Sequence, residues 1–233
     1  DLPLSRGLGD VYKRQKEIRA SRIDLTQALV SRLRDIGMPD LFISGSAIGF
    51  YGESKDRDFS ETDAVGSGFS AQLCHDWEAS ISNIGSEGTR CVLLRTGVVL
   101  DRALGAYPQM TQSFRFGLAS WMGQGDHWLS WIHLADIVGA ILHCIQNEAV
   151  SGPVNMTAPS PVTHRSFSDE VRNATTTLVG MGMPGWVMRL MVGEMADELL
   201  LTGQRVMPTK LLSTGYEFRF GELRDAVADL ERQ

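Results

Sequence analysis

The chain has 233 residues, of which 43% are hydrophobic and 21% charged, and its formal net charge is −6. This composition supports a buried core and excludes an intrinsically disordered protein. A negative charge provides no basic field for nucleic acid, and no apolar run approaches the ~20 residues of a membrane span, so we expect neither partner.

The first fifteen residues differ from the rest of the chain. Residues 1–15 end in GLGDVYKRQ, which resembles a translated sequencing adaptor, so we expect this leader to be non-native and leave it out of the fold prediction. The three cysteines, Cys74, Cys91 and Cys144, are far apart and never form a CxxC motif. The sequence therefore predicts no disulfide framework, no metal site and a reducing, cytoplasmic location.

From Lys16 onward, helix and strand patterns alternate along the chain. Apolar residues recur at helical spacing up to Gly37, and a strand is predicted at 41–44 before a polar loop at 53–68. Further elements are predicted at 70–83 (helix), 91–100 (buried strand), 128–132 (strand), 134–147 (helix), 152–157 (strand), from Thr163 (helix) and at 222–231 (helix). Residues 101–127 read as loop-rich, with a short helix near 108–116. This alternation predicts an α/β domain with a parallel sheet.

The stretch LFISGSAIGFYG, Leu41 to Gly52, is the candidate ligand site. A buried strand here runs into Ser44, Gly45 and Ser46, which place two hydroxyls and an accessible backbone at the end of the strand. In an open α/β sheet, ligands bind outside the carboxyl ends of the strands. The alternative is a strand followed by a turn, in which the small residues serve only the bend.

No glycine-rich phosphate loop follows a strand in this sequence. Gly7 and Gly9 form a GxG, but position 12 is Tyr and no strand precedes it. Such a loop at a helix N-terminus normally holds the pyrophosphate of a dinucleotide. Either the ligand is different or the chain lacks the front of its domain, and the leader favours the second interpretation.

Several motifs in order along the chain resemble one family. They are KEIRASRIDLTQALV, LFISGSAIGFYG, CHDWE, LLRTGVVL, WIHLAD, GPVNMTAPSPV and TGQRVMPTKLLSTGYEFRF. Together they resemble the epimerase-family proteins, an atypical branch of the extended short-chain dehydrogenases/reductases. The resemblance implies an α/β fold, with a partial NAD(P)-binding Rossmann domain at 16–160 that lacks its first strands. It also implies a smaller α+β C-terminal domain, at 161–233, of unassigned or substrate-binding role, and a fragment without its glycine-rich loop.

The resemblance also implies roles for single residues. Ser46 matches the hydroxyl that contacts a substrate oxygen. The cofactor, NADP with NAD as the alternative, is expected to contact Glu17, Arg22, Ser44, Gly45, Thr96 and Gly97. Arg22 could hold a phosphate or ribose oxygen by a charge-assisted bond. The alternative for Glu17 and Arg22 is that both are ordinary solvated helix charges.

One departure from the superfamily pattern concerns the proton donor. Related reductases use a YxxxK motif, but counting back from Glu78 puts Cys74 at the Lys position and Ser70 at the Tyr position. Serine has no useful acidity near neutral pH, so the usual relay is missing. We predict that Tyr51 substitutes for it beside Ser46, the alternative being that Tyr51 only packs in a turn.

Other polar and aromatic residues receive mostly structural predictions. In WIHLAD, Asp136 is expected to cap the following helix and His133 to be structural. Arg115, Trp121 and Trp128 are predicted to line a substrate pocket, although the aromatic side chains fit a core equally well.

Two classes of function follow. The first is an NADP-dependent oxidoreductase or epimerase with an atypical active site, acting on an unidentified small molecule. The second is a catalytically silent nucleotide-binding protein that works through interaction, because some relatives carry a cell-division-inhibitor label. Ser46 favours the first class and the missing YxxxK favours the second. The sequence does not indicate an oligomeric state.

Overall fold

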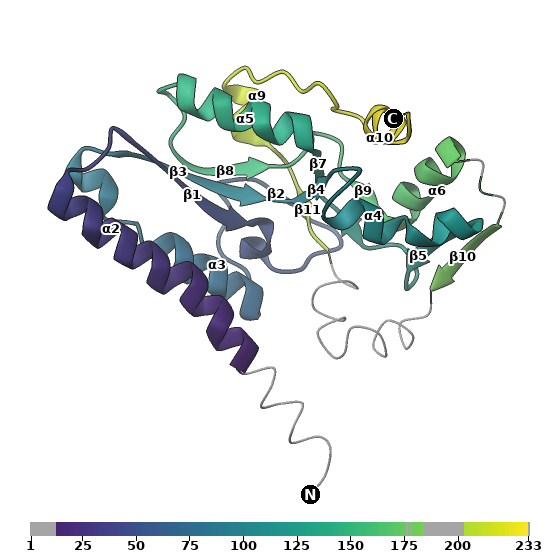
Figure 1. Ribbon diagram of the computed structural model, residues 1–233, viewed down its shortest axis with the longest axis horizontal. Helices are drawn as coiled ribbons and strands as arrows, with labels where there is room; N and C mark the ends of the chain where they lie inside the picture. The colour runs from purple at the N-terminus through teal and green to yellow at the C-terminus, as the bar shows by residue number, and fades with distance from the viewer. Residues whose placement is uncertain (1–12, 176, 178, 184–202, 233) are drawn as a thin grey trace, which may run out of the picture.

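Three parallel strands form the central sheet of the computed structural model, which describes residues 13–175, 177, 179–183 and 203–232 (Figure 1). They are β1 (Leu41–Ala47), β3 (Arg90–Thr96) and β8 (Gly152–Met156), in the order β1-β3-β8. Within the described part of the chain β1 pairs only with β3, so its other edge has no strand partner. The predicted α/β class with a parallel sheet is confirmed.

Helices cover both faces of this sheet because its middle strand is apolar on both sides. Cys91 and Leu93 of β3 pack with Val30 of the helix α2 (Leu25–Ile36), whereas Val92 and Leu94 pack with residues of the helix α5 (Leu134–Gln146). Successive side chains of a strand point to opposite faces, which explains this division. The helices are α2 (Leu25–Ile36) and α3 (Phe69–Ala79) on one side and α5 (Leu134–Gln146) on the other (Figure 1).

The first helix is longer than α2 alone. Residues 13–19 are helical and continue through a π-helical stretch, Ala20–Asp24, into α2. Gly37 ends the helix with a φ of +119°, a conformation that favours glycine. The predicted helix from Lys16 to Gly37 is therefore confirmed.

Two predicted strands are each divided in two. The predicted strand 91–100 breaks at Gly97, after which β4 (Val98–Leu100) leaves β3 and pairs with β7 (Trp131–His133). A Cβ atom on Gly97 would lie 2.5 Å from the carbonyl oxygen of Ser130, so only glycine fits this crossing. The predicted strand 128–132 likewise divides into β6 (Trp128–Leu129) and β7.

Beyond the central sheet, the described residues form further short paired strands and four more helices. The pairs are β5 (Leu118–Met122) with β10 (Val179–Met183), β6 with β9 (Val162–Thr163), and β2 (Asp58–Phe59) with β11 (Arg205–Val206). The helices are α4 (Ala106–Met110), α6 (His164–Thr175), α9 (Thr209–Ser213) and α10 (Leu223–Glu231). The described residues also form three 3₁₀ turns, η2 (Ile48–Tyr51), η3 (Ile84–Glu87) and η4 (Gln112–Phe116). β2 and β5 lie where polar or glycine-containing sequence predicted loops.

The C-terminal segment, residues 203–232, packs against the first half of the chain. Leu211, Tyr216 and Phe218 pack in the same cluster as Val92 and Leu94 of β3. The predicted boundary between 16–160 and 161–233 stays a prediction. The Met-rich stretch that begins at residue 181 lies mainly outside the described residues.

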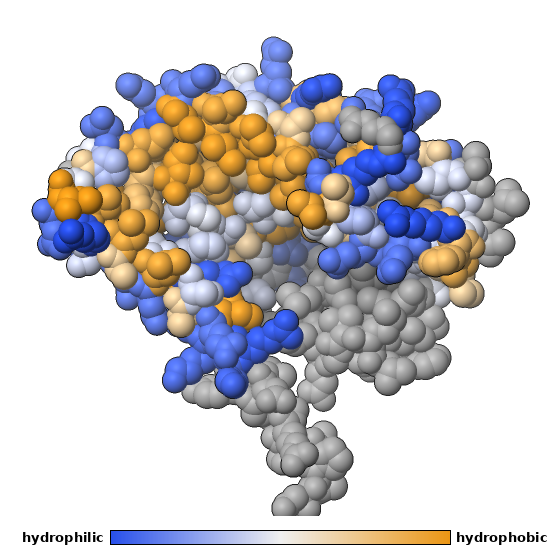
Figure 2. Space-filling model, viewed as in Figure 1, coloured by the Kyte–Doolittle hydropathy of each residue, from blue (hydrophilic) through white to orange (hydrophobic). Residues whose placement is uncertain are grey.

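One face of α5 is apolar and exposed. Leu134, Val138, Leu142 and Ile145 form a stripe along the helix and are 42–51% exposed, and Figure 2 shows apolar side chains gathered over this part of the surface. No helix in the described ranges is long and apolar enough to span a membrane.

Candidate active site

The carboxyl ends of β1 and β3 bring the predicted ligand residues to one edge of the sheet. In the parallel register Ser46 lies beside Arg95, and Ala47 lies beside Thr96. Ser44, Gly45 and Gly97 flank these positions in the chain. The structure therefore places the predicted strand-end residues close together, as the sheet geometry requires.

Ser46 belongs to a buried charged cluster. Its hydroxyl donates a 2.6 Å hydrogen bond to Oε1 of Glu78, which lies on α3. Arg95 donates from Nε and Nη2 to the two oxygens of the same carboxylate, each at 2.8 Å. The side chains of Arg95 and Glu78 are only 4% and 9% exposed, so this bidentate pair has lost most of its hydration and each partner depends on the other.

The cluster continues through Tyr51. Arg95 Nη1 donates to the Tyr51 hydroxyl at 2.9 Å, and that hydroxyl donates to Oδ1 of Asn155 at 2.6 Å. The guanidinium also lies 3.5 Å from the ring centroid of Phe50. Tyr51 is 2% exposed, and burial raises its pKa to about 12. The phenol is therefore protonated at neutral pH, and its hydroxyl both donates and accepts within the protein.

Asn155 of β8 ties this cluster to the C-terminal segment. Its side-chain amide donates to the carbonyl of Met207 at 2.9 Å, and its backbone N–H donates to Oε1 of Glu61 at 3.1 Å. The same Glu61 oxygen accepts from the backbone N–H of Lys210. The buried network thus reaches from the end of β1 to the segment that follows β11.

Sequence reasoning missed Glu78, Arg95 and Asn155 as members of the site. A signal was present, because Arg95 is a charge within the apolar run of β3, and a fully buried arginine requires a partner. The sequence did not indicate which acid would supply it.

The predicted cofactor residues on the two strands have small local roles of their own. The hydroxyls of Ser44 and Thr96 make 3.2 Å hydrogen bonds to carbonyls of their own strands. A Cβ atom on Gly45 would lie 3.1 Å from the ring of Trp77, and Gly97 lies against Ser130 as described above. Packing alone thus explains both glycines, and the role of all four residues toward a cofactor stays a prediction.

Arg22 and Glu17 lie on the first helix. The Arg22 guanidinium stands 5.6 Å from the ring centroid of Trp77, the same ring that packs on Gly45, so one indole connects it to the end of β1. Arg22 donates to the carbonyl of Ile18 and to the Ser21 hydroxyl, which are both neutral oxygens. Glu17 is exposed. Their contact with a cofactor stays a prediction.

The positions of the missing YxxxK motif face the 3₁₀ turn η2. A Cβ atom on Gly49 would lie 3.3 Å from Cβ of Ser70 and 3.9 Å from Sγ of Cys74. Cys74 is 5% exposed, and burial raises the pKa of its thiol. A small hydroxyl and an inert thiol therefore pack against η2 where a tyrosine and a lysine would otherwise stand.

The WIHLAD motif corrects one prediction. Asp136 does not cap α5, because the capping group is His133, whose Nδ1 accepts from the backbone N–H of Ala135 at 3.1 Å. Asp136 is 1% exposed and accepts from the backbone N–H groups of Arg219 and Phe220, each at 2.8 Å, and from the hydroxyl of Tyr216. We call these four residues, Asp136, Tyr216, Arg219 and Phe220, the C-terminal clasp.

The three residues predicted to line a substrate pocket do not converge. Arg115 lines a pocket beside α10, whose lining includes neither tryptophan. Trp128 donates to the carbonyl of Lys55, and the ring of Trp121 lies 5.0 Å from the guanidinium of Arg165. No group of three or more potential metal ligands occurs in the described residues.

Comparison with known proteins places this arrangement in a family. Residues 183–230 match the Domain of unknown function (DUF1731). An epimerase family protein of Mycobacterium leprae is 38% identical over 214 residues, which cover 92% of this chain and 69% of that protein. The mouse epimerase family protein SDR39U1 is 34% identical over 93% of this chain and 74% of its own length.

Solved structures agree with these sequence matches. The crystal structure of the human epimerase family protein SDR39U1 (isoform 2), determined with NADPH, has a TM-score of 0.89 at 30% identity and covers 95% of this chain and 75% of that chain. A UDP-glucose 4-epimerase from Thermotoga maritima has a TM-score of 0.76 at 16% identity, covers 94% of this chain and 71% of that chain, and shows the fold alone. The chain therefore belongs to the epimerase family, an atypical branch of the extended short-chain dehydrogenases/reductases.

Proposed function

We propose that the protein is an NADP(H)-dependent oxidoreductase or epimerase that acts on a small molecule through a hydroxyl group held at Ser46. One observation carries the proposal. Ser46 lies near the carboxyl end of β1, and a buried carboxylate–guanidinium pair orients its hydroxyl. The human relative solved with NADPH supports the choice of cofactor.

The strand-end residues fit the nicotinamide side of a dinucleotide. The hydroxyls of Ser44 and Thr96 make only long bonds to carbonyls of their own strands, so they can turn toward a ligand at little cost. Arg22 bonds neutral oxygens and keeps N–H groups available for a phosphate. Bound NADP(H) would supply hydride transfer. No glycine-rich phosphate loop occurs in the 233 residues, and we assign no residue to the pyrophosphate.

The orientation of the Ser46 proton indicates the class of substrate group. Because the hydroxyl donates to Glu78, its oxygen presents lone pairs to the ligand edge. An oxygen with free lone pairs accepts a hydrogen bond from a substrate hydroxyl and gives none to a carbonyl. Arg95 holds the carboxylate on both oxygens and so fixes this orientation.

Tyr51 fits a positioning role in this proposal. Its hydroxyl is already engaged by Arg95 and Asn155, and its pKa of about 12 makes proton loss unfavourable at neutral pH. Proton donation by Tyr51, as predicted from the sequence, would require this network to open first. In the closed network Tyr51 holds Arg95 in place and acts on Ser46 through Glu78.

The test combines mapping of ligand binding with a turnover assay. The NMR chemical shifts of the backbone amides would be followed on titration with NADPH and, separately, with nicotinamide mononucleotide. NADP⁺ reduction would be measured with a panel of small alcohols and sugars. Ser46→Ala is compared with Ser82→Ala, because Ser82 is an exposed serine beyond α3 and outside this site.

We expect NADPH to shift the amides of Ser44, Ser46 and Thr96, and we expect Ser46→Ala to reduce turnover at least about tenfold, as for the loss of one oriented hydrogen bond. Ser82→Ala should match the parent protein. Cofactor shifts at the strand ends without turnover of any compound would favour the silent nucleotide-binding protein instead. Shifts that avoid β1 and β3 would refute the placement of the cofactor.

A further inference from the structure

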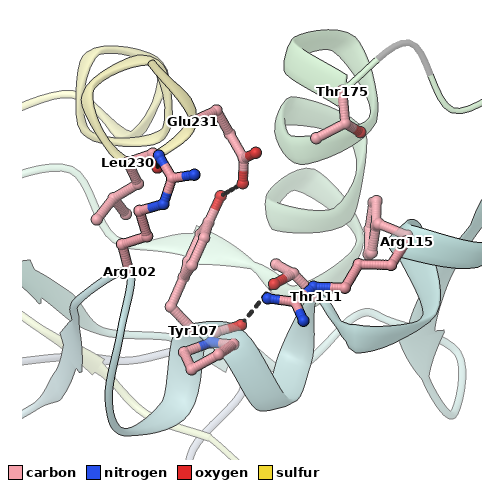
Figure 3. Close-up of a pocket in the computed structure, with 9 residues that line it drawn as sticks. Arg102, Tyr107, Thr111, Arg115, Thr175, Leu230 and Glu231 are labelled. Carbon is pink, nitrogen blue, oxygen red and sulfur yellow. Dashed lines mark hydrogen bonds between the residues drawn. The ribbon is translucent and has the colours of Figure 1, made fainter. Parts of the chain in front are cut away.

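A pocket of about 300 Å³ opens between α4, η4, α6 and α10 (Figure 3). No residue of β1, β3 or α3 lines it, so it is separate from the site at Ser46. Its position beside the end of α10 brings together segments that are more than 100 residues apart in the sequence, and the fold alone creates it.

Two arginines that form no ion pair with a described residue line this pocket. Arg102 uses one N–H to donate to the carbonyl of Leu230 at 3.3 Å, which leaves its other donors available. Arg115, in the last turn of η4, makes no hydrogen bond or ion pair with any described residue. In a chain of net charge −6, two such guanidinium groups beside one pocket form a local positive site.

The rest of the lining is mixed, since Thr111, Thr175 and Glu231 stand beside apolar side chains, and its apolar members are firmly held. Tyr107, Phe114 and Leu230 are 2%, 7% and 5% exposed and belong to the core cluster of this half of the molecule. The Tyr107 hydroxyl donates to Oε1 of Glu231 at 2.6 Å, which fixes both the ring and the single carboxylate of the pocket (Figure 3). The lining thus holds one carboxylate, engaged by this phenol, and two guanidinium groups, so its balance of charge is positive.

We propose that this pocket binds a small oxyanion, a phosphate or carboxylate, carried on a compact apolar body. The guanidinium groups of Arg102 and Arg115 bind the oxyanion, because planar guanidinium donors match these groups in geometry and charge. The body of the ligand lies against Phe114, Tyr107 and Leu230. A volume of about 300 Å³ stands at the lower end of ligand pockets, so it suits a single ring and not a dinucleotide.

Calorimetric titration of the protein tests this with defined probes. The probes are phenyl phosphate, benzoate, inorganic phosphate and benzyl alcohol, which separate the phosphate, the carboxylate and the apolar body from one another. The variants are Arg102→Gln, Arg115→Gln and the double substitution. Arg224→Gln is the matched control, since Arg224 is exposed on α10, outside the pocket, and its substitution changes the net charge equally.

We expect phenyl phosphate or benzoate to bind at least about tenfold more tightly than benzyl alcohol, and the double variant to lose that advantage while Arg224→Gln keeps it. If phenyl phosphate binds more tightly than benzoate, the ligand's charged group is a phosphate; if benzoate binds more tightly, it is a carboxylate. Thermal unfolding of each variant should match the parent protein, because Arg102 and Arg115 are exposed. Equal binding by the double variant and Arg224→Gln, or no saturation by any oxyanion at millimolar concentration, would overturn the proposal.

Discussion

Two buried carboxylates, Glu78 at the ends of the strands and Asp136 in the C-terminal clasp, are satisfied in opposite ways. Glu78 is paired with a cation, Arg95, and also accepts from Ser46, whose oxygen keeps lone pairs for a ligand. Asp136 accepts from two backbone N–H groups and one phenol, all of them neutral donors of the protein. All of these donors to Asp136 therefore come from the protein itself. A buried acid with a hydroxyl beside it fits the site that we propose at Ser46, whereas an acid enclosed by backbone donors holds two segments of the fold together.

The largest expected effect comes from breaking the ion pair. Arg95→Leu should lower the free energy of unfolding by about 3–5 kcal/mol, because it leaves Glu78 charged and unpaired in a buried position. Urea unfolding measures this. The double variant Glu78→Leu/Arg95→Leu should lose less than Arg95→Leu alone. Arg32→Leu, on the exposed face of α2, is the control and should stay within about 0.5 kcal/mol.

Asp136→Asn tests the other carboxylate. An amide keeps the shape but turns two hydrogens toward backbone N–H groups, so at least one buried donor loses its acceptor. We expect a loss of about 2–3 kcal/mol by the same unfolding measurement. Asp35→Asn, at an exposed surface pair on α2, should be nearly neutral. A neutral result at Asp136 would mean that the clasp does not hold the C-terminal segment.

Lowering the pH should destabilise the C-terminal half, which buries His164. The cluster of Ser46, Glu78, Arg95 and Tyr51 contains no histidine. Burial lowers the pKa of His164 to about 3, and the ring of His127 lies 4.5 Å away. The folded pKa is below the unfolded value of about 6.5, so His164 stabilises the fold above pH 6.5, and that stability is lost as pH falls toward 3.

Between pH 6.5 and pH 5 this group should cost about 2 kcal/mol, at about 1.4 kcal/mol per pH unit. The measurement is unfolding free energy at pH 7.5 and pH 5 for the parent protein, His164→Leu and His75→Asn. His164→Leu should show the smaller loss between the two pH values, and the exposed His75 should change nothing. An unchanged pH dependence in His164→Leu would place the acid response elsewhere.

The smallest effects come from the two tyrosines that complete the networks. Tyr51→Phe removes an acceptor of Arg95 and the donor to Asn155, and should cost about 1–2 kcal/mol. Tyr216→Phe removes one of three donors to Asp136 and should cost about 1 kcal/mol or less. Equal losses would weaken the distinction between the two carboxylates. Turnover should fall in Tyr51→Phe and persist in Tyr216→Phe, since only Tyr51 belongs to the network of Ser46.

Local sequence patterns predicted most of the secondary structure. The helix predicted at 134–147 is Leu134–Gln146, and the strand predicted at 152–157 is Gly152–Met156. The division of the strand 91–100 was not predicted, because it arises where the chain crosses the carbonyl of Ser130, more than 30 residues away. Asp136 was assigned to the wrong role for a similar reason, since its donors lie more than 80 residues further along the chain.

The sequence by itself determined the α/β class, the parallel sheet and the serine-rich end of β1, because hydrophobic periodicity and strand-to-turn transitions are properties of neighbouring residues. It also indicated the family, through motifs that keep their order along the chain. Only the tertiary structure decided that Glu78 meets Arg95 and Ser46, that Asp136 receives the C-terminal segment, and that Arg102 and Arg115 share a pocket. A buried charge must be matched by a donor, but strand register and helix packing select that donor among residues distant in sequence.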